Sequence, residues 1–327
     1  EKMKFKDVIK LWTLTTILTA IEQTKAVSSK IFDKYFKANA KPVMGNTATL
    51  KIRKGAGVVL KTILPGAERL VKDLKDVYEI TIKLPRFGLQ DTILPHEINE
   101  FESLEGEAKA EAVSRKIATI LKEHKDDYMT TLEFMCVGAL FGKVVDGSGK
   151  VLFEFRSTAT PIEFKNKEID VVLNEIDNAL VDELGTEVPY DILCSNDFFN
   201  KVVTKAKTAG EFDNKTASYI DEEGTRILVL HGKRFVPYRA SYPDENGNNK
   251  KFLKENTAIV IPKSEKVYEV VYGRADHTEA VKVAPKMFFA ATPQELERGK
   301  GYAIDTEMKA MPYCTRPSAL INLVFSN

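Results

Sequence analysis

A single long amphipathic helix constrains this chain more than any other feature. Apolar residues recur at steps of three and four between residues 110 and 139, which places them on one face of a helix over residues 107–142. At about 1.5 Å per residue, such a helix spans roughly 50 Å, whereas the average globular helix has about 11–12 residues. The pattern therefore predicts a flat, elongated subunit that packs against copies of itself.

Two β-rich stretches flank this helix. Before it, Ala48, Leu50 and Ile52 alternate with polar residues, and a second alternating run covers residues 78–84. Residues 47–95 contain too few apolar side chains for a core of their own, and because isolated hairpins are marginal in water, they need a partner surface. After the helix, Asp-Gly and Ser-Gly steps at 146–149 predict a hairpin over residues 144–155.

The rest of the chain alternates helices and short strands. Residues 1–45 are expected to form an arm with helical spacing near residues 14–21. Residues 165–305 are expected to form a compact lobe, with one helix closed by Gly185 and a second helix capped by Ser195 or Asn196. The expected strands of the lobe cover residues 190–194, 227–230, 235–238, 258–261 and 267–272. A terminal β run, residues 319–325, must return to a sheet.

Charge and hydropathy are those of an ordinary folded protein. Hydrophobic residues make up 43% and charged residues 29% of the chain, and the net charge is +1. A protein that mainly grips nucleic acid carries a basic excess, so bulk DNA binding is disfavoured. Residues 41–83 are basic and residues 91–111 are acidic. These blocks either dock across a boundary between subunits, or form two solvated faces.

Sorting and redox signals are weak. The three cysteines (Cys136, Cys194 and Cys314) are far apart, which favours a reducing compartment over a disulfide framework or a zinc site. No run of about 18 apolar residues predicts a membrane span, and the first residues do not resemble a signal peptide. The sequence begins with Glu1, which leaves processing and trimming equally open.

Candidate chemical groups do not converge. The four histidines lack metal-ligand spacing, and His124 falls on the apolar face of the long helix, as expected of a core or interface histidine. Gly55-Ala56-Gly57 precedes β-type residues and predicts a turn. Cys194-Ser195 lies at a strand-to-helix junction, where either a nucleophile or a buried Cys beside an N-cap Ser fits. We expect no catalytic, cofactor or metal site, so the chain is not expected to be an enzyme.

Several stretches carry a family resemblance in their order. They are LFGKVVDGSGKV (140–151), FEF (153–155), PYDILCS (189–195), GKRFVPY (232–238), YGRA (272–275) and RPSAL (316–320). Together with the order of arm, β excursion, long helix, hairpin, lobe and terminal strand, they resemble the major capsid proteins of tailed bacteriophages. The specific resemblance is to the phage capsid protein E family, with the HK97-type fold.

The resemblance implies an α+β HK97-like capsid fold. Its parts would be an N-terminal arm (1–45), an extended β E-loop (46–100), a P domain with the spine helix and hairpin (101–164), a compact A domain (165–305), and a C-terminal strand returning to the P domain (306–327). The E-loop would lie over a neighbouring subunit. The residues expected at that assembly interface are Arg53, Lys54, Gly55, Gly57, Lys61 and Arg69.

The implied function is that of a major head protein of the virion, assembled in the host cytoplasm. Hexamers and pentamers of this chain would close into an icosahedral shell around double-stranded DNA, which they contact only weakly. A portal, a scaffold, a maturation protease and a decoration protein are expected partners; a membrane is not. The alternatives are an encapsulin-like compartment shell that holds protein cargo, and a soluble enzyme or binding protein with an unrecognised site.

Overall fold

A computed structural model of the chain describes residues 4–26, 29–55, 77–155, 160–244, 246–264 and 267–325. The chain divides into two compact units. The first unit comprises residues 1–48, 81–133 and 270–312, and the second comprises residues 49–80, 134–269 and 313–327. The expected single lobe over residues 165–305 is thereby corrected, because residues 270–305 belong to the first unit.

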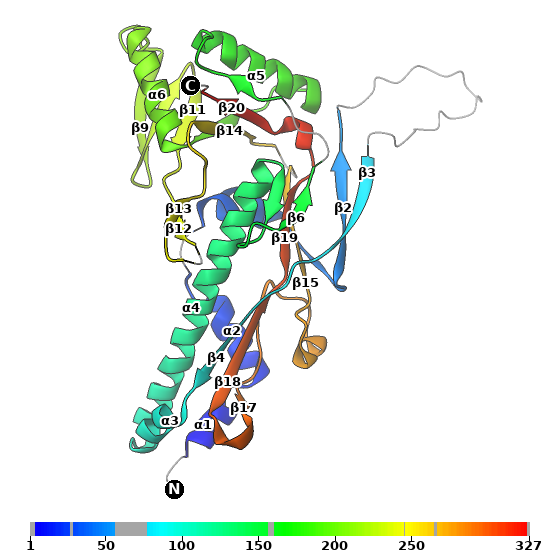
Figure 1. Cartoon of the computed structure of the whole chain (residues 1–327), viewed down its shortest axis with the longest axis vertical. Coiled ribbons are helices and arrows are strands. Elements are labelled where there is room, and N and C mark those ends of the chain that lie inside the picture. Colours follow the sequence, from blue (N-terminus) through cyan, green and yellow to red (C-terminus); the bar gives the residue numbers. More distant parts are fainter. Residues whose placement is uncertain are drawn as a thin grey trace, which may run out of the picture. The chain divides into compact units, whose positions relative to one another are not determined.

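Helices and short helical turns occur in all three segments of the first unit. They are α1 (Phe5–Lys10), α2 (Leu14–Gln23), the π-helical turn η1 (Phe32–Phe36), the 3-10 turn η2 (Lys37–Asn39), α3 (Pro95–Glu102), and the short turns η3 (Thr278–Lys282) and η4 (Glu297–Gly299). The long helix α4 (Gly106–Leu140) begins in this unit and ends in the second (Figure 1). It confirms the helix expected over residues 107–142.

The apolar faces of α1, α2 and α4 meet in one core. Its buried members are Phe5, Val8, Ile9, Ile17, Ile21, Ile93, Val113, Ile117, Ile120, Leu121, Ala290, Tyr302 and Ile304. The N-terminal residues were expected to form an arm, but residues 5–23 pack on α4 of their own chain. Burying each large apolar side chain contributes about 1.5–3 kcal/mol, so two amphipathic helices gain more by folding onto α4 than by extending into solvent.

Strands on one side of the first unit centre on β18. The strands β4 (Phe87–Ile93), β16 (Phe288–Ala290) and β17 (Gln294–Glu295) all pair antiparallel with β18 (Tyr302–Met308). The segment before β18 passes close to β4: a Cβ on Gly301, whose φ is +116°, would lie 2.2 Å from the carbonyl oxygen of Ile93. Only glycine fits that approach.

A second sheet of this region has three strands. In it, β1 (Ala40–Val43) pairs parallel with β15 (Tyr268–Gly273), and β15 is also bonded to β19 (Ala310–Cys314). The expected strand over residues 267–272 is thus present. Its pairing with β1, rather than with the strands of the expected lobe, explains why the lobe ends near residue 269.

A seven-stranded sheet forms the body of the second unit. Its strand order is β7 (Ile162–Glu163), β20 (Ile321–Val324), β14 (Thr257–Pro262), β8 (Tyr190–Cys194), β11 (Lys233–Pro237), β10 (Thr225–Leu230) and β9 (Ala217–Glu222). The expected strands at 190–194, 227–230, 235–238 and 258–261 are all in it. The terminal strand β20 lies between β7 and β14. The expected boundary at residues 164 and 165 therefore falls inside one sheet.

Two helices pack on this sheet. They are α5 (Ile169–Leu184) and α6 (Asn196–Thr208), and their apolar faces share one core with β8, β11, β14 and β20. As expected, α5 ends at Gly185, whose φ of +78° is left-handed, and the Ser195 side chain accepts a hydrogen bond from the backbone of Phe198 at the start of α6.

Three two-stranded ribbons and one short turn complete the chain. The ribbons are β2 (Thr47–Arg53) with β3 (Val77–Lys83), β5 (Lys143–Val145) with β6 (Val151–Glu154), and β12 (Ser241–Pro243) with β13 (Asn249–Lys251); the turn is η5 (Pro317–Ala319). The pair β5–β6 is the hairpin expected over residues 144–155. Its turn is held by Asp146, whose carboxylate accepts the backbone N–H groups of Ser148 and Lys150, each at 3.0 Å.

Candidate assembly surface

Three of the six residues expected at the assembly surface lie together at the end of β2. Arg53 is the last residue of the strand, and Lys54 and Gly55 follow it; we call these three residues the loop root. The side chains of Arg53 and Lys54 are exposed. The other three residues lie outside the described part of the chain: Gly57, Lys61 and Arg69.

Two residues from distant parts of the sequence hold Gly55. Its N–H donates to Glu183 Oε1 at 3.0 Å, and its carbonyl accepts from Arg316 Nη1 at 2.9 Å. The same guanidinium nitrogen donates to the carbonyl of Glu183 at 3.2 Å. In addition, the N–H of Arg53 donates to the carbonyl of Thr315 at 2.7 Å. The loop root is therefore bonded to the end of α5 and to residues 315–316, all within the second unit.

Neither Glu183 nor Arg316 was predicted from the sequence as a contact of the loop root. The sequence did contain one signal for Glu183. A carboxylate in the last turn of a helix is repelled by the negative end of the helix dipole, so it needs a hydrogen-bonding or ion-pair partner. No basic residue occupies the last turn of α5. Its partner groups therefore had to come from elsewhere in the chain. Arg316 was noted only as part of a family-like stretch, and nothing local pointed to its contacts.

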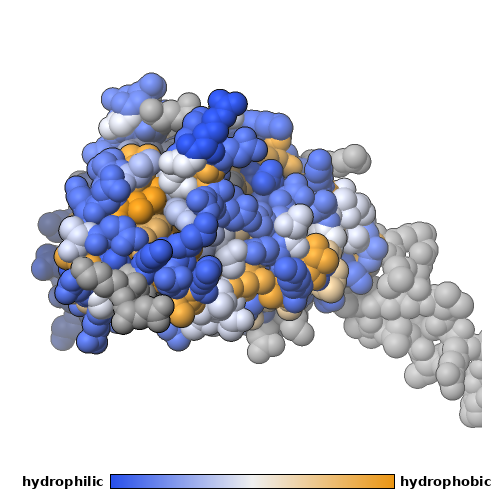
Figure 2. All heavy atoms as spheres, turned by 90° about the horizontal axis from the view of Figure 1, so that it is seen from below, coloured by the Kyte–Doolittle hydropathy of each residue, from blue (hydrophilic) through white to orange (hydrophobic). Residues whose placement is uncertain are grey.

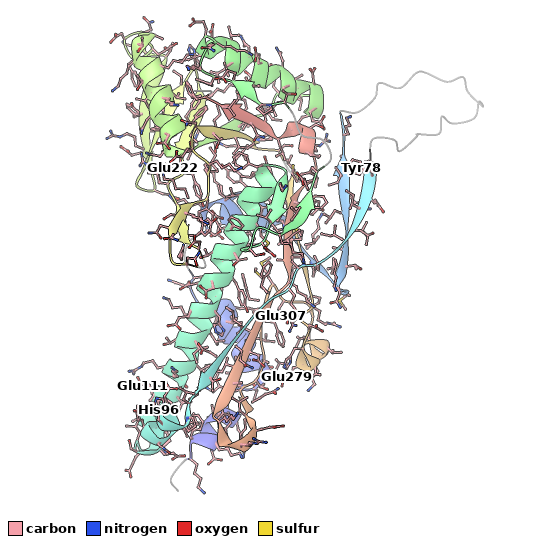
Figure 3. The ribbon with its side chains drawn as sticks, viewed as in Figure 1. Tyr78, His96, Glu111, Glu222, Glu279 and Glu307 are labelled. Carbon is pink, nitrogen blue, oxygen red and sulfur yellow. The ribbon has the colours of Figure 1, made fainter. Side chains whose placement is uncertain are left out.

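The ribbon β2–β3 buries one strand better than the other. On β2, Ala48, Leu50 and Ile52 are buried, as their alternation predicts. On β3, none of the seven residues is buried, although the strand contains Val77, Tyr78, Ile80 and Ile82. Tyr78 is 38% exposed and is labelled on the ribbon in Figure 3. The ribbon thus presents half-covered apolar side chains on β3.

Other exposed apolar residues are dispersed. In the first unit they are Leu11, Met44, Leu94, Leu104 and Val281. Figure 2 shows a face on which hydrophobic residues form small groups separated by hydrophilic ones. Scattered apolar residues of this kind are normal on soluble proteins. In the second unit, Tyr219 and Ile220 are exposed next to each other on β9, and on β3 Tyr78 is exposed while Val77, Ile80 and Ile82 are partly buried.

The acidic block at residues 91–111 is largely paired within its own unit. Glu97 lies 2.8 Å from Lys116, Glu102 lies 2.5 Å from Lys109, and Glu111 lies 2.7 Å from Arg115. Glu111 on α4 and His96 on α3 are both labelled in Figure 3. These local pairs account for much of the block's charge, which weakens the case for docking it against a basic block of another subunit.

His124 connects α4 to β18 in the first unit. Its Nδ1 lies 2.8 Å from Thr306 Oγ1, which lies 2.9 Å from the Tyr128 hydroxyl; that hydroxyl also accepts the N–H of Leu89 at 3.0 Å. Burial lowers the pKa of His124, although Asp91 works in the opposite direction. Burial also raises the pKa of Tyr128 to about 12. His124 is therefore a hydrogen-bonded core histidine.

A cavity of about 430 Å³ opens near β18 in the first unit. The charged groups on its wall are engaged with one another: Arg86 Nε lies 2.7 Å from Glu307 Oε2, and the N–H of Asp276 donates to the same carboxylate at 2.7 Å. On the opposite side, Gln90 donates to Asp305 at 2.7 Å. This mutual satisfaction makes the cavity a structural hollow rather than an arrangement of groups aimed at a ligand.

The Cys194-Ser195 step is structural. Cys194 is fully buried, and burial raises the pKa of its thiol, which disfavours the nucleophilic thiolate. The Ser195 hydroxyl accepts the N–H groups of Phe198 and Thr257, each at 3.3 Å. Of the two interpretations that the sequence left open, a buried Cys beside an N-cap Ser is the one present.

Two searches of the described residues gave negative results. Among them, no group of three or more His, Cys, Asp or Glu side chains is placed to hold a metal ion. The helices within the same ranges include none with the length and apolar character needed to cross a bilayer.

Comparison with known sequences identifies a protein family and a curated relative. The model of the family "Phage major capsid protein E" matches residues 13–325. The major capsid protein of Salmonella phage Felix O1 is 22% identical over 298 residues, which cover 76% of this chain and 78% of that protein.

Solved structures resemble the fold over nearly the whole chain. A protein assigned as a prophage capsid protein from Escherichia coli CFT073 matches with a TM-score of 0.59 and 12% identity, covering 96% of this chain and 99% of that one. A phage-related protein from Bordetella bronchiseptica RB50 matches with a TM-score of 0.52 and 11% identity, covering 95% and 96%. With its α+β fold of the HK97 capsid type, the chain belongs to the phage major capsid protein E family.

Proposed function

We propose that this chain is the repeating subunit of a phage head, in which hexamers and pentamers close into an icosahedral shell around double-stranded DNA. Membership of the capsid protein E family supports the class of protein. It favours a phage head over a compartment shell for protein cargo, and over a soluble enzyme.

The observation that carries self-assembly is the exposure of β3. Four apolar or aromatic residues occupy this strand, and none of them is buried in the isolated chain. A two-stranded ribbon is marginal in water unless another surface covers it. We infer that a second copy of the chain covers β3, because the family consists of capsid proteins and capsid subunits contact identical subunits.

The same reasoning assigns the segments. Within the expected E-loop (46–100), the ribbon β2–β3 lies over a neighbour, with the loop root and the residues Gly57, Lys61 and Arg69 at that contact, whereas β4 pairs with β18 of its own chain. The second unit contains most of the A domain, whose ends meet around the fivefold and sixfold axes. The first unit, with most of α4, contributes the P domain. Interfaces of obligate assemblies bury thousands of Å², which is enough to hold a shell without covalent links.

The chemistry of the chain supports a wall rather than a catalyst. Its net charge of +1 lets packaged DNA lie against the shell with few phosphate contacts. The buried Cys194 and the capping role of Ser195 leave that junction without a reactive group. A portal, a scaffold, a maturation protease and a decoration protein are the candidate partners of such a head.

Assembly of the purified protein tests the proposal. We expect rings, tubes or closed particles in negative-stain electron microscopy, and fast-sedimenting species in analytical ultracentrifugation. Particles purified from infected cells should contain DNA rather than a cargo enzyme. A chain that stays monomeric at millimolar concentration, across a range of salt and pH, would contradict the proposal.

A further inference from the structure

Side chains bind both backbone hydrogen-bonding groups of Gly55, and we call this pair of contacts the grip on Gly55. A carboxylate oxygen of Glu183 accepts its N–H at 3.0 Å, and a guanidinium nitrogen of Arg316 donates to its carbonyl at 2.9 Å. Gly55 has a φ of +74°, a left-handed conformation that glycine adopts without strain. Fixing both polar groups of such a permissive residue selects one conformation from many.

Arg316 also binds the backbone of Glu183. Glu183 lies in the last turn of α5, where backbone carbonyls lack partners within the helix. Arg316 donates to the carbonyl of Glu183 at 3.2 Å, which places a cation at the negative end of the helix dipole. Arg316 is thus bonded at once to the end of α5 and to the loop root.

A second attachment lies two residues earlier. The N–H of Arg53 donates to the carbonyl of Thr315 at 2.7 Å, and the N–H of Thr315 donates to the carbonyl of Val267 at 2.8 Å. Arg53 is thus bound by the backbone of Thr315, and Gly55 is bound by the side chain of Arg316. The backbone of residues 53–55 is therefore fixed by contacts with the end of α5 and with residues 315–316.

We propose that Arg316 and Glu183 are positioning residues for assembly: they set the direction in which the E-loop leaves the subunit, and thereby the geometry of the contact between neighbours. This inference rests on the proposed function. Neither residue belongs to the core cluster of the second unit, which consists of apolar side chains from its sheet, α5 and α6. Loosening the grip should therefore change how subunits join while leaving the unit folded.

The variants separate the grip from its charge. E183A removes the acceptor for the Gly55 N–H, whereas E183Q keeps an acceptor oxygen at the same place. R316A removes both donor contacts, and R316K keeps the charge without the planar guanidinium. The matched control is E175A. Glu175 lies on the same helix, and its replacement removes an ion pair to Lys167 at 2.7 Å that does not involve the loop root.

The first readout is the local mobility of the loop root. A nitroxide attached to K54C reports on the backbone beside Gly55, and labelling is selective because all three native cysteines are buried. In dissociated subunits, we expect E183A and R316A to narrow the spectral lines of this label. E183Q and E175A should leave them as in the parent protein. Circular dichroism melting checks that each variant is folded.

The second readout is the product of assembly. We expect E183A and R316A to lower the fraction of closed particles of uniform diameter at least fivefold in electron micrographs, in favour of tubes, open sheets or mixed sizes. E183Q and E175A should resemble the parent. If R316A fails to fold, E183A and R316K replace it in the comparison with the parent. R316K, which lacks the planar guanidinium, should then also lower the fraction of uniform closed particles.

The outcomes distinguish this inference from the proposed function. Unchanged label mobility in E183A and R316A would contradict the positioning role of Glu183 and Arg316. Closed particles of these two variants with the parent's size distribution would contradict it as well. A parent protein that forms no particles would contradict the proposed function instead, and the label would still report on the grip in the free subunit.

Discussion

Lys125 and Glu133, about two turns apart on α4, hold opposite helix ends of the N-terminal segment. Lys125 Nζ donates to the carbonyls of Ile21, Glu22 and Thr24 at 2.6, 2.9 and 2.8 Å, at the end of α2. The carboxylate of Glu133 accepts the Ser29 hydroxyl and the N–H groups of Ile31 and Phe32 at 2.5, 2.9 and 2.9 Å, where η1 begins. Each charge matches the dipole of the helix end that it binds.

Replacing Glu133 with alanine should loosen this attachment. The buried N–H groups of Ile31 and Phe32 would lose their acceptor, which should cost about 3 kcal/mol in the free energy of unfolding. Urea denaturation of the purified subunit measures the loss. The control is Glu123→Ala on the exposed face of the same helix, which should change stability by less than about 0.5 kcal/mol. Equal losses in the two variants would contradict the role of Glu133.

His124 should make the subunit sensitive to acid. Because burial lowers its pKa below the ordinary value of 6.5, the unfolded chain binds more protons than the folded chain between the two pKa values. Stability should therefore be full above about pH 7 and fall as the pH drops below the ordinary pKa of 6.5. Melting temperatures across this range measure the slope.

Two substitutions isolate the contribution of His124. His124→Gln should flatten the acid-dependent part of the profile, because no imidazole remains to be protonated. His96→Gln is the control, since His96 is exposed and its loss should leave the slope as it was. A profile that is equally steep in His124→Gln and in the parent would assign the acid sensitivity to another group.

Gly301 should not tolerate a side chain. Alanine there would require a left-handed φ of +116° and would place its Cβ 2.2 Å from the carbonyl oxygen of Ile93, so the pairing of β18 with β4 would have to shift. We expect Gly301→Ala to lower stability by about 2 kcal/mol or more. Gly147→Ala is a clean comparison, because nothing lies within 4 Å of the Cβ that it adds. A neutral Gly301→Ala would mean that the close approach is not required.

A charge on the apolar side of β3 should block assembly without unfolding the subunit. Ile80 is only half-buried in the isolated chain, so Ile80→Asp should change its melting temperature little. In the shell, an unpaired carboxylate would be buried against a neighbour, which is strongly unfavourable. We expect at least a tenfold drop in particle yield by sedimentation.

The next residue of β3 gives the control for this substitution. Thr81→Asp adds the same charge on the other face of the strand, where the side chain is exposed. It should assemble better than Ile80→Asp. Equal yields from the two variants would show that the neighbour does not cover the Ile80 face.

Local features were predictable because their causes are local. The helical period of apolar residues specified α4, and the left-handed Gly185 and the Ser195 cap marked the ends of helices flanking β8. The Asp-Gly and Ser-Gly steps specified the hairpin β5–β6. The surface of packing was not local: α2 has visible helical spacing, yet its sequence does not say that Ile17 and Ile21 bury against α4 rather than against another chain.

The candidate site divides in the same way. Alternation along β2 and β3 predicted the two strands, because burial on a strand repeats every second residue, but it did not predict that they pair with each other. The hydrogen bonds to Gly55 come from Glu183, which lies 128 positions later in the sequence, and from Arg316, which lies 261 positions later. Contacts between such distant residues leave no periodic pattern in the sequence. The lobe boundary near residue 269 was missed for a related reason, since pairing of β15 with β1 depends on a strand more than two hundred residues away.

By itself, the sequence determined the long helix, the hairpin after it, several strands and helix ends of the second unit, and the family resemblance, because propensity, period and turn chemistry act over a few residues. Only the tertiary structure decided that the N-terminal helices pack on their own α4, that β20 lies inside the sheet of the second unit, and that Arg316 and Glu183 hold the loop root. Those outcomes depend on which distant groups can satisfy one another's buried polar atoms and apolar faces, and that is a property of the folded chain as a whole.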